Sequence, residues 1–256
     1  MKLVKAFLLL TALLVLSPGA ARVALAQDGL TAEPVTFAGH LYFDFGTGAM
    51  YVPKGGAKTE LAGDVYNNTN PNPGANFGFS STDLAAQWGD RLATTATGIL
   101  QENDFTVFNS TTGVLNSASF NISLYDGTSL ALLGSYTTGT VTFGAGLPAS
   151  SYSIITITGL GGLNINVNTT DVIMLQQVAA KTGTTTRLGI ASLNPPSIGT
   201  SIPQMYINAT TVGPAGFYNI GTAPNYTPAN PGYRVNLNQP VPADNRTWGS
   251  VKALYR

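Results

Sequence analysis

The chain has 256 residues and no cysteine, and its 12 basic and 12 acidic side chains make up a charged fraction of only 9%. An ordinary soluble domain has about 25% charged residues. The shortage of Lys and Arg argues against nucleic-acid binding, and a single histidine without cysteine argues against zinc and similar metal sites.

The first 26 residues have the pattern of a secretory signal peptide. Lys2 and Lys5 precede the apolar run AFLLLTALLVL, and Ala24-Leu25-Ala26 makes a cleavage site just before Gln27. The apolar run is well short of the roughly 20 residues that span the hydrocarbon core of a membrane. We therefore expect a secreted or cell-surface protein from which residues 1–26 are removed, with no transmembrane segment left after cleavage.

Residues 27–237 are predicted to form one antiparallel β-sandwich of the jelly-roll kind. In SASFNISLYDGTS, the apolar residues Phe120, Ile122 and Leu124 alternate with polar ones, and Asp126-Gly127 makes a turn. Turn residues recur about every 8–15 positions without a sustained helical period, which is typical of a sandwich or barrel. Further predicted strands are HLYFDF, AMYVP, DRLATTATGI, DFTVFN, TVTFGAG, SYSIITIT, LNINVN, TRLGIAS, QMYINA, GFYNIG and GYRVNL.

Two segments are less regular. TTDVIMLQQVAAK (169–181) reads as a buried strand or as a short helix capped by Thr170 or Asp171, and the apolar run favours the strand. NNTNPNPGANFGFSST (67–82) is rich in Asn, Pro and Gly, which predicts a long surface loop. Residues 238–245 are predicted to be a proline-rich tether.

No catalytic site is predicted. His40 shares a strand face with Asp44, so a pair is conceivable, but no nucleophile motif accompanies them and a local structural role is favoured. Close carboxylates occur at Glu102 and Asp104, and more loosely at Asp83 and Asp90. Because a sandwich places such pairs by chance, we interpret them as solvated turn residues and expect a protein that is not an enzyme.

No cofactor is expected, with calcium as the alternative left open. The stretch DVYNNTNPN, which begins at Asp64, offers oxygen ligands but contains no EF-hand loop. Tyr42, Phe43, Phe45 and Tyr51 would form a sugar-stacking surface if they faced outward, although strand aromatics usually belong to the core. An extracellular carbohydrate-binding module, with polysaccharide as its ligand, is therefore the alternative function.

The last eleven residues, RTWGSVKALYR (246–256), carry three of the 12 basic side chains and one of the two tryptophans. Residues 27–245 hold six basic and twelve acidic residues, so the body is acidic and the tail basic. A helix of ten residues is unstable alone, so we expect this tag to order on a partner, or alternatively on its own sandwich. The predicted docking residues are Trp248, Val251, Lys252, Leu254, Tyr255 and Arg256.

A family resemblance covers roughly residues 88–237. GDRLATTATG, FNISLYDGT, YSIITITGLGGLNINVNTTDVIMLQQ, RLGIASLNPPSIG, GFYNIG and NPGYRVNL resemble secreted bacterial β-sandwich proteins that end in a short surface-sorting tail, as in the PEP-CTERM class. The resemblance includes no catalytic motif. This chain lacks the Pro-Glu-Pro signal, the hydrophobic span and the arginine cluster of that class, so RTWGSVKALYR would be a different tag.

The sequence therefore predicts a secreted bacterial structural protein of the cell surface or extracellular matrix. Edge strands with few lysines do little to discourage edge-to-edge pairing. A chain whose terminus or edge strand binds the next copy forms a fibre unless it closes into a ring. The expected partners are other copies of the chain, in a homo-oligomer or fibre, or cell-surface components.

Overall fold

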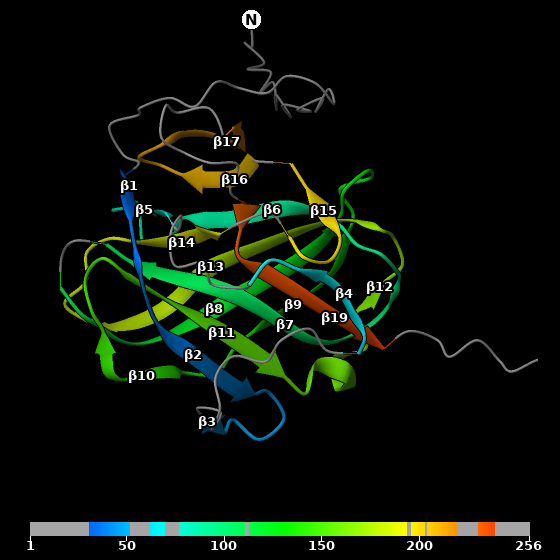
Figure 1. The fold of residues 1–256 in the computed structure, drawn as a ribbon, viewed down its shortest axis with the longest axis horizontal. Coiled ribbons are helices and arrows are strands. Elements are labelled where there is room, and N and C mark those ends of the chain that lie inside the picture. Colours follow the sequence, from blue (N-terminus) through cyan, green and yellow to red (C-terminus); the bar gives the residue numbers. More distant parts are fainter. Residues whose placement is uncertain are drawn as a thin grey trace, which may run out of the picture.

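The computed structural model describes residues 31–51, 62–69, 77–110, 113–193, 196–202, 204–219 and 230–238. The predicted signal peptide (1–26), the tag (246–256) and all of the tether except Asn238 lie outside these ranges. The described residues confirm the predicted fold class, because they form two packed β-sheets with one short 3-10 helix, η1 (Leu160–Leu163), as Figure 1 shows.

The larger sheet has 11 strands in the described residues. Its main path runs β1-β5-β14-β7-β11-β2-β3, while β19 pairs with β7 and β4, β12 with β7, and β18 with β14. The strands are β1 (Thr31–Pro34), β2 (Thr36–Asp44), β3 (Met50–Tyr51), β4 (Asp64–Asn67), β5 (Phe77–Ser81), β7 (Gly98–Asn109), β11 (Ser151–Thr158), β12 (Asn166–Val167), β14 (Leu188–Leu193), β18 (Asn230–Pro231) and β19 (Tyr233–Asn238).

The smaller sheet has eight strands in the order β10-β8-β13-β6-β16-β17, with β9 beside β8 and β15 beside β6. They are β6 (Gln87–Ala93), β8 (Leu115–Asp126), β9 (Leu132–Thr137), β10 (Val141–Leu147), β13 (Asp171–Gly183), β15 (Thr200–Ser201), β16 (Gln204–Ala209) and β17 (Gly213–Asn219). β13 pairs with β8 on one side and β6 on the other, which confirms that TTDVIMLQQVAAK is a strand.

The main core lies between the two sheets. Phe120, Ile122 and Leu124 of β8 are at most 1% exposed, as their alternation predicted. Phe105 of β7 meets Phe120 edge to face, with ring centroids 5.1 Å apart. Such pairs stabilise a fold beyond the burial of their area.

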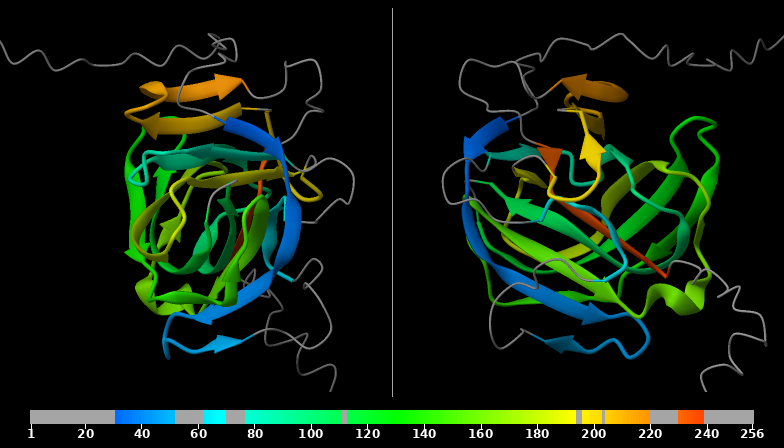
Figure 2. Two further views of the ribbon diagram at one scale, coloured as in Figure 1. Left: turned by 90° about the vertical axis from the view of Figure 1, so that its left-hand side faces the viewer. Right: turned by 45° about the vertical axis from the view of Figure 1, so that its right-hand side comes forward.

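The larger sheet also curls on itself, so that part of its second face is enclosed. β1 and β2 follow each other with one residue between them, and β1 pairs with β5 while β2 pairs with β11. Figure 2 shows this long N-terminal strand along one side of the molecule. The enclosed face holds a second small core, made of Phe108, Tyr152, Ile154, Ala191 and Leu193 with Val35 packed against it.

One strand pair differs from the predicted antiparallel sandwich, because β2 and β11 are parallel. A parallel pair needs a long crossover, and more than a hundred residues separate the two strands here. Two predicted strands also differ in extent: DRLATTATGI is divided between β6 and β7, and LNINVN contributes only β12.

The predicted loop at 67–82 is wrong at both ends, while residues 70–76 lie outside the described ranges. Asn67 belongs to β4, and Phe77–Ser81 forms β5 between β1 and β14. A Cβ atom on Gly78 would lie 2.5 Å from the ring of Phe108. The glycine that indicated a loop instead lets an aromatic ring pack directly on a strand.

Candidate functional site

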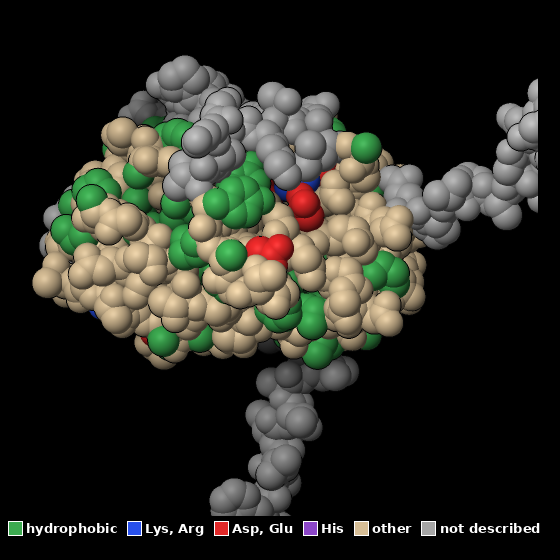
Figure 3. Space-filling model, turned by 90° about the horizontal axis from the view of Figure 1, so that it is seen from below, with side chains coloured by type: hydrophobic (Ala, Val, Ile, Leu, Met, Phe, Trp, Pro, Cys, Tyr) green, Lys and Arg blue, Asp and Glu red, His purple; other side chains and the backbone are tan. Residues whose placement is uncertain are grey.

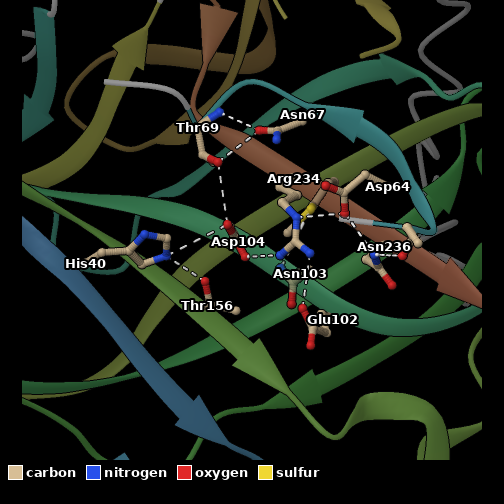
Figure 4. A network of polar contacts seen from close by, with 12 residues as sticks. His40, Asp64, Asn67, Thr69, Glu102, Asn103, Asp104, Thr156, Arg234 and Asn236 are labelled. Atoms are coloured by element: carbon tan, nitrogen blue, oxygen red, sulfur yellow. Dashed lines mark hydrogen bonds and ion pairs between the residues drawn. The ribbon is translucent and has the colours of Figure 1, made fainter. Parts of the chain in front are cut away.

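A row of side chains crosses the larger sheet on the face turned away from the main core. Arg234 of β19 lies opposite Asp104 of β7. Thr156 of β11 lies opposite Asp104 in turn, and Tyr42 of β2 lies opposite Thr156. Opposite residues on neighbouring strands share a face and lie about 5 Å apart. Four strands distant in sequence therefore place their side chains in one line, and Figure 4 shows Arg234, Asp104 and Thr156 of this row from close by.

Arg234 is the centre of this row. Its Nε donates to Asp64 Oδ1 at 2.8 Å, its Nη1 to Asp104 Oδ1 at 3.0 Å, and its Nη2 to Glu102 Oε2 at 3.1 Å. The Arg234 side chain is 3% exposed, and those of Asp64, Asp104 and Glu102 are 0%, 2% and 21% exposed. A planar guanidinium presents its donors in a fixed fork that suits several carboxylates at once. One buried cation thus joins β19 to β4 and β7.

The pKa values of Asp104 and Arg234 are both raised, but for different reasons. Burial raises the pKa of Asp104 to about 6, although Arg234 and Thr156 favour its ionised form. Burial alone would lower the pKa of Arg234, but the neighbouring carboxylates outweigh it and hold the pKa above its ordinary value. Three carboxylates face one guanidinium, so a proton taken up by Asp104 relieves an excess of negative charge.

His40 of β2 extends the network to the N-terminal strand. A hydrogen bond of 2.6 Å joins His40 Nε2 and Thr156 Oγ1, and the same nitrogen lies 3.9 Å from Asp104 Oδ2. The His40 ring stacks on Tyr42 with centroids 4.6 Å apart, and Tyr42 stacks on Tyr51 of β3 at 5.1 Å. The histidine is therefore held both by polar contacts and by an aromatic column.

Amide and hydroxyl groups complete the surroundings. Asn236 Nδ2 donates to Asp64 Oδ1 at 2.8 Å and to the carbonyl of Ala62 at 3.2 Å. Thr69 Oγ1 donates to Asn67 Oδ1 at 2.9 Å and lies 3.5 Å from Asp104 Oδ2. Buried charges are tolerated where further hydrogen bonds satisfy them, which these groups provide.

The centre of the network is closed to solvent. His40 is 7% exposed, Asp104 2% and Thr156 0%, so a substrate has no direct access to them. An open depression of about 540 Å³ lies beside the cluster and is lined by Ala62, Gly63, Gln101, Asn236, Leu237 and Asn238. Its lining carries no charge, and Asn236 belongs both to the depression and to the network drawn in Figure 4.

The conceivable pair of His40 and Asp44 does not form. Asp44 accepts hydrogen bonds from the backbone N–H and the hydroxyl of Thr47, both at 2.8 Å, and these bonds lower its pKa. Residues four apart on a strand share a face but are about 13 Å apart, at 3.3 Å per residue. The carboxylate that His40 faces comes instead from a strand two places away in the sheet.

The interpretation of the carboxylate pairs as solvated turn residues is wrong for three of the four. Glu102 and Asp104 lie within β7 and bind Arg234. Asp90 lies in β6, is 0% exposed, and accepts hydrogen bonds from Ser201 Oγ and from the N–H of Arg91. Asp83 is a turn residue, as predicted, and binds the N–H and the hydroxyl of Thr210.

The oxygens considered for calcium have other partners. Asp64 Oδ1 accepts from Arg234 and Asn236, and Asn67 Oδ1 accepts from Thr69. In the described part of the chain, no group of three or more His, Asp or Glu side chains is arranged to hold a metal ion. The guanidinium of Arg234 stands among the carboxylates, where a cation would have to bind.

The four aromatic residues do not share one surface. Tyr42 is 0% exposed within the stack on His40, and Phe43 packs in the main core. Phe45 is half-buried against Tyr136, with centroids 5.6 Å apart at 83°. Only Tyr51, at 45% exposure, presents a ring to solvent, so these residues do not form a sugar-stacking platform.

Arg234 is the central residue that sequence reasoning missed. Its signal is the alternation in GYRVNLN, where Tyr233, Val235 and Leu237 face the core and therefore place Arg234 and Asn236 on the other face. Residues 27–245 contain only six basic residues, so an arginine within an apolar alternation indicates a buried acidic partner. Which partner it has depends on strand order.

The predicted docking residues Trp248, Val251, Lys252, Leu254, Tyr255 and Arg256 lie outside the described residues. Within the described ranges, no helix has the length and hydrophobicity needed to cross a membrane. Comparison of the chain with protein-family models, curated proteins and solved structures returned no match.

Proposed function

We propose that this chain is a secreted bacterial structural protein of the cell surface or extracellular matrix. In this proposal the sandwich is a non-catalytic scaffold, and the tag at 246–256 attaches it to other copies or to surface components. The sequence features that support it are the signal-peptide pattern, the low charge and the basic, aromatic tag.

The observation that carries the proposal is the position of the strand that precedes the tag. β19 ends at Asn238, eight residues before Arg246, and lies between β7 and β4. Its Arg234 is held by carboxylates on both neighbours. A tag that follows this strand is linked to the interior of a sheet, which suits a scaffold that must keep its attachment under load.

The same network supports a non-catalytic role. A general acid or base must come within hydrogen-bond reach of a substrate, about 2.6–3.2 Å. His40 and Asp104 are almost fully buried and are bound to Thr156 and Arg234. Their contacts hold strands together, and their burial keeps a substrate out of hydrogen-bond reach.

Self-association is supported by the edges of the smaller sheet. β9, β10 and β17 contain no Lys, Arg, Asp or Glu. Natural edge strands usually carry such charges to prevent pairing between molecules. Leu132 of β9 is 56% exposed, which adds apolar surface to this edge. Figure 3, which views the molecule from below relative to Figure 1, shows few charged side chains on that face.

Deletion of residues 246–256 tests the proposal. We expect the truncated protein to lose surface retention or assembly while its thermal unfolding stays unchanged. Cell fractionation and sedimentation of secreted protein measure this, and Leu132→Lys separately tests the β9 edge. If full-length and truncated proteins fractionate identically and both remain monomeric, the proposal is refuted.

A second candidate function, carbohydrate binding, is favoured by the outer face of the smaller sheet. A polar row crosses five strands in register, formed by Asn208, Gln87, Gln177, Asn121 and Thr137. Beside it, Tyr206 and Phe217 pack edge to face with centroids 5.5 Å apart. Amides that donate and accept suit sugar hydroxyls, and aromatic rings suit sugar faces.

An insoluble-polysaccharide pull-down with wild type and Asn121→Ala/Gln177→Ala separates the two candidates. Retention of the wild type with at least tenfold weaker retention of the double variant would favour carbohydrate binding. The same weak retention for both proteins would exclude this face as a glycan site.

A further inference from the structure

β2, the second strand of the described fold, and β19, its last strand, run in the same direction within one sheet. β2 is parallel to β11, β11 is antiparallel to β7, and β7 is antiparallel to β19. β2 and β19 are therefore parallel to each other, with two strands between them. Their arrows point the same way in Figure 1.

The register places the start of β2 and the end of β19 at opposite ends of this sheet. Thr36, which begins β2, is opposite Ser151, and Ser151 is opposite Asn109 of β7. Asn238, which ends β19, is opposite Ile99 of the same β7. Asn109 and Ile99 are ten residues apart, which is about 33 Å along a strand.

Tension between these ends would act along the strands. In antiparallel pairs the backbone hydrogen bonds are perpendicular to the strands, so a force along the strands loads all the bonds of an interface together. A force on two ends at the same side of the sheet would instead open the bonds one after another. The first geometry resists forced unfolding more strongly, because several bonds must break in one step.

The buried polar network crosses each interface on this path. Arg234 joins β19 to β7 through Asp104 at 3.0 Å. Asp104 faces His40 of β2 at 3.9 Å, and His40 is bonded to Thr156 of the intervening β11 at 2.6 Å. Figure 4 shows these groups as one chain of contacts from β19 to β2.

We propose that the sandwich is a tension-bearing unit in which the Arg234–Asp104–His40 network, called the staple below, holds β2 and the last strand, β19, together against shear. The biological meaning of this role rests on the proposed attachment at a surface or in a matrix. The resistance of the sandwich to a pulling force is a property of the isolated protein, and it can be measured without a cell or a partner.

The absence of cysteine makes the pulling direction easy to define, because two introduced cysteines become the only thiols. Thr36→Cys with Asn238→Cys places handles at the opposite ends of the sheet. Ala49→Cys with Asn238→Cys places both at the same end, because Ala49 lies in the turn that follows β2. All three positions are exposed.

Single-molecule force spectroscopy on the full chain compares the two handle pairs at one loading rate. We expect the Thr36/Asn238 pair to rupture at a force at least twofold higher than the Ala49/Asn238 pair. Equal forces would overturn the load-bearing role. If the full-length and the tag-deleted protein fractionate identically, the proposed function is refuted, but the difference in rupture force still stands.

The staple is tested with the Thr36/Asn238 handles. Arg234→Met should lower the rupture force, and His40→Gln provides a milder variant in case Arg234→Met folds poorly. Arg91→Met is the matched control, because Arg91 binds Asp171 between β6 and β13 of the other sheet and lies off the path. Rupture forces for Arg234→Met and His40→Gln equal to that of Arg91→Met would refute the staple.

Discussion

Replacement of Arg234 by methionine is expected to cost a large part of the folding free energy. Methionine keeps an unbranched side chain of similar length but removes the guanidinium that binds Asp64, Asp104 and Glu102. Removing one partner of a buried ion pair typically destabilises a protein by about 3–5 kcal/mol, because the remaining charge stays buried. Asp64 and Asp104 are both nearly inaccessible, so the upper half of this range applies.

A loss of about 4 kcal/mol is measurable by equilibrium unfolding in urea and by thermal unfolding. For a domain of this size, 1 kcal/mol corresponds to about 2–4 °C in Tm, so we expect a decrease of about 8–16 °C. Arg91→Met is the control, because the side chains of Arg91 and Asp171 are 40% and 32% exposed. Exposed pairs contribute about 0–1 kcal/mol.

The comparison between Arg234→Met and Arg91→Met decides whether the buried network stabilises the fold. If Arg234→Met loses no more stability than Arg91→Met, the buried network does not hold β19 in the sheet. A double-mutant cycle of Arg234→Met with Asp104→Asn then measures their coupling directly, and a value near zero would contradict the contact described above.

Three further predictions concern buried groups. The pKa of Asp104 is raised from 3.8 to about 6. Its protonation therefore stabilises the folded protein fully below pH 3.8, and this contribution is lost as the pH rises through 6. The unfolding free energy of wild type minus that of Asp104→Asn should therefore fall by about 3 kcal/mol between pH 3.5 and 7, and a constant difference would contradict the shift. Burial raises the pKa of Asp90 well above its ordinary value, so its stabilising contribution also decreases with rising pH. Asp90→Asn keeps an amide oxygen that accepts from the N–H of Arg91, and its Nδ2 can donate to the hydroxyl oxygen of Ser201. The variant should therefore be at least as stable as wild type in urea unfolding at pH 8. Gly78→Ala places a Cβ atom 2.5 Å from Phe108 and should lower the unfolding free energy by about 1–3 kcal/mol. Gly216→Ala is the control, because no atom lies within 4 Å of its Cβ position, and it should change stability by less than about 0.5 kcal/mol. Equal effects of the two substitutions in denaturant unfolding would refute the packing argument.

The strands were predictable to a large extent because alternation is a local property. Phe120, Ile122 and Leu124 had to share one face of any strand that contains them, and that face had to be buried. The same rule placed Arg234 and Asn236 together, opposite Tyr233 and Val235. The loop prediction at 67–82 failed because glycine was interpreted from its backbone freedom, whereas Gly78 serves the close packing of Phe108.

The candidate site was not predictable in the same way. His40, Asp64, Asp104 and Arg234 come from four strands, and Asp64 and Arg234 are 170 residues apart along the chain. Their proximity depends on strand order and register, which no local pattern specifies. Asp104 therefore looked like a solvated residue until β19 was placed beside β7.

The amino-acid sequence by itself determined that this chain is β-rich, low in charge, free of disulfides and bordered by a signal-like start and a basic end. These properties follow from composition and from the alternation of residues along each strand. Only the tertiary structure decided that β1 and β2 close the larger sheet around a second small core, and that the same face of this sheet carries a buried cation among three carboxylates. The physical reason is that burial of a charge depends on what lies across the neighbouring strand, and that neighbour is set by the fold as a whole.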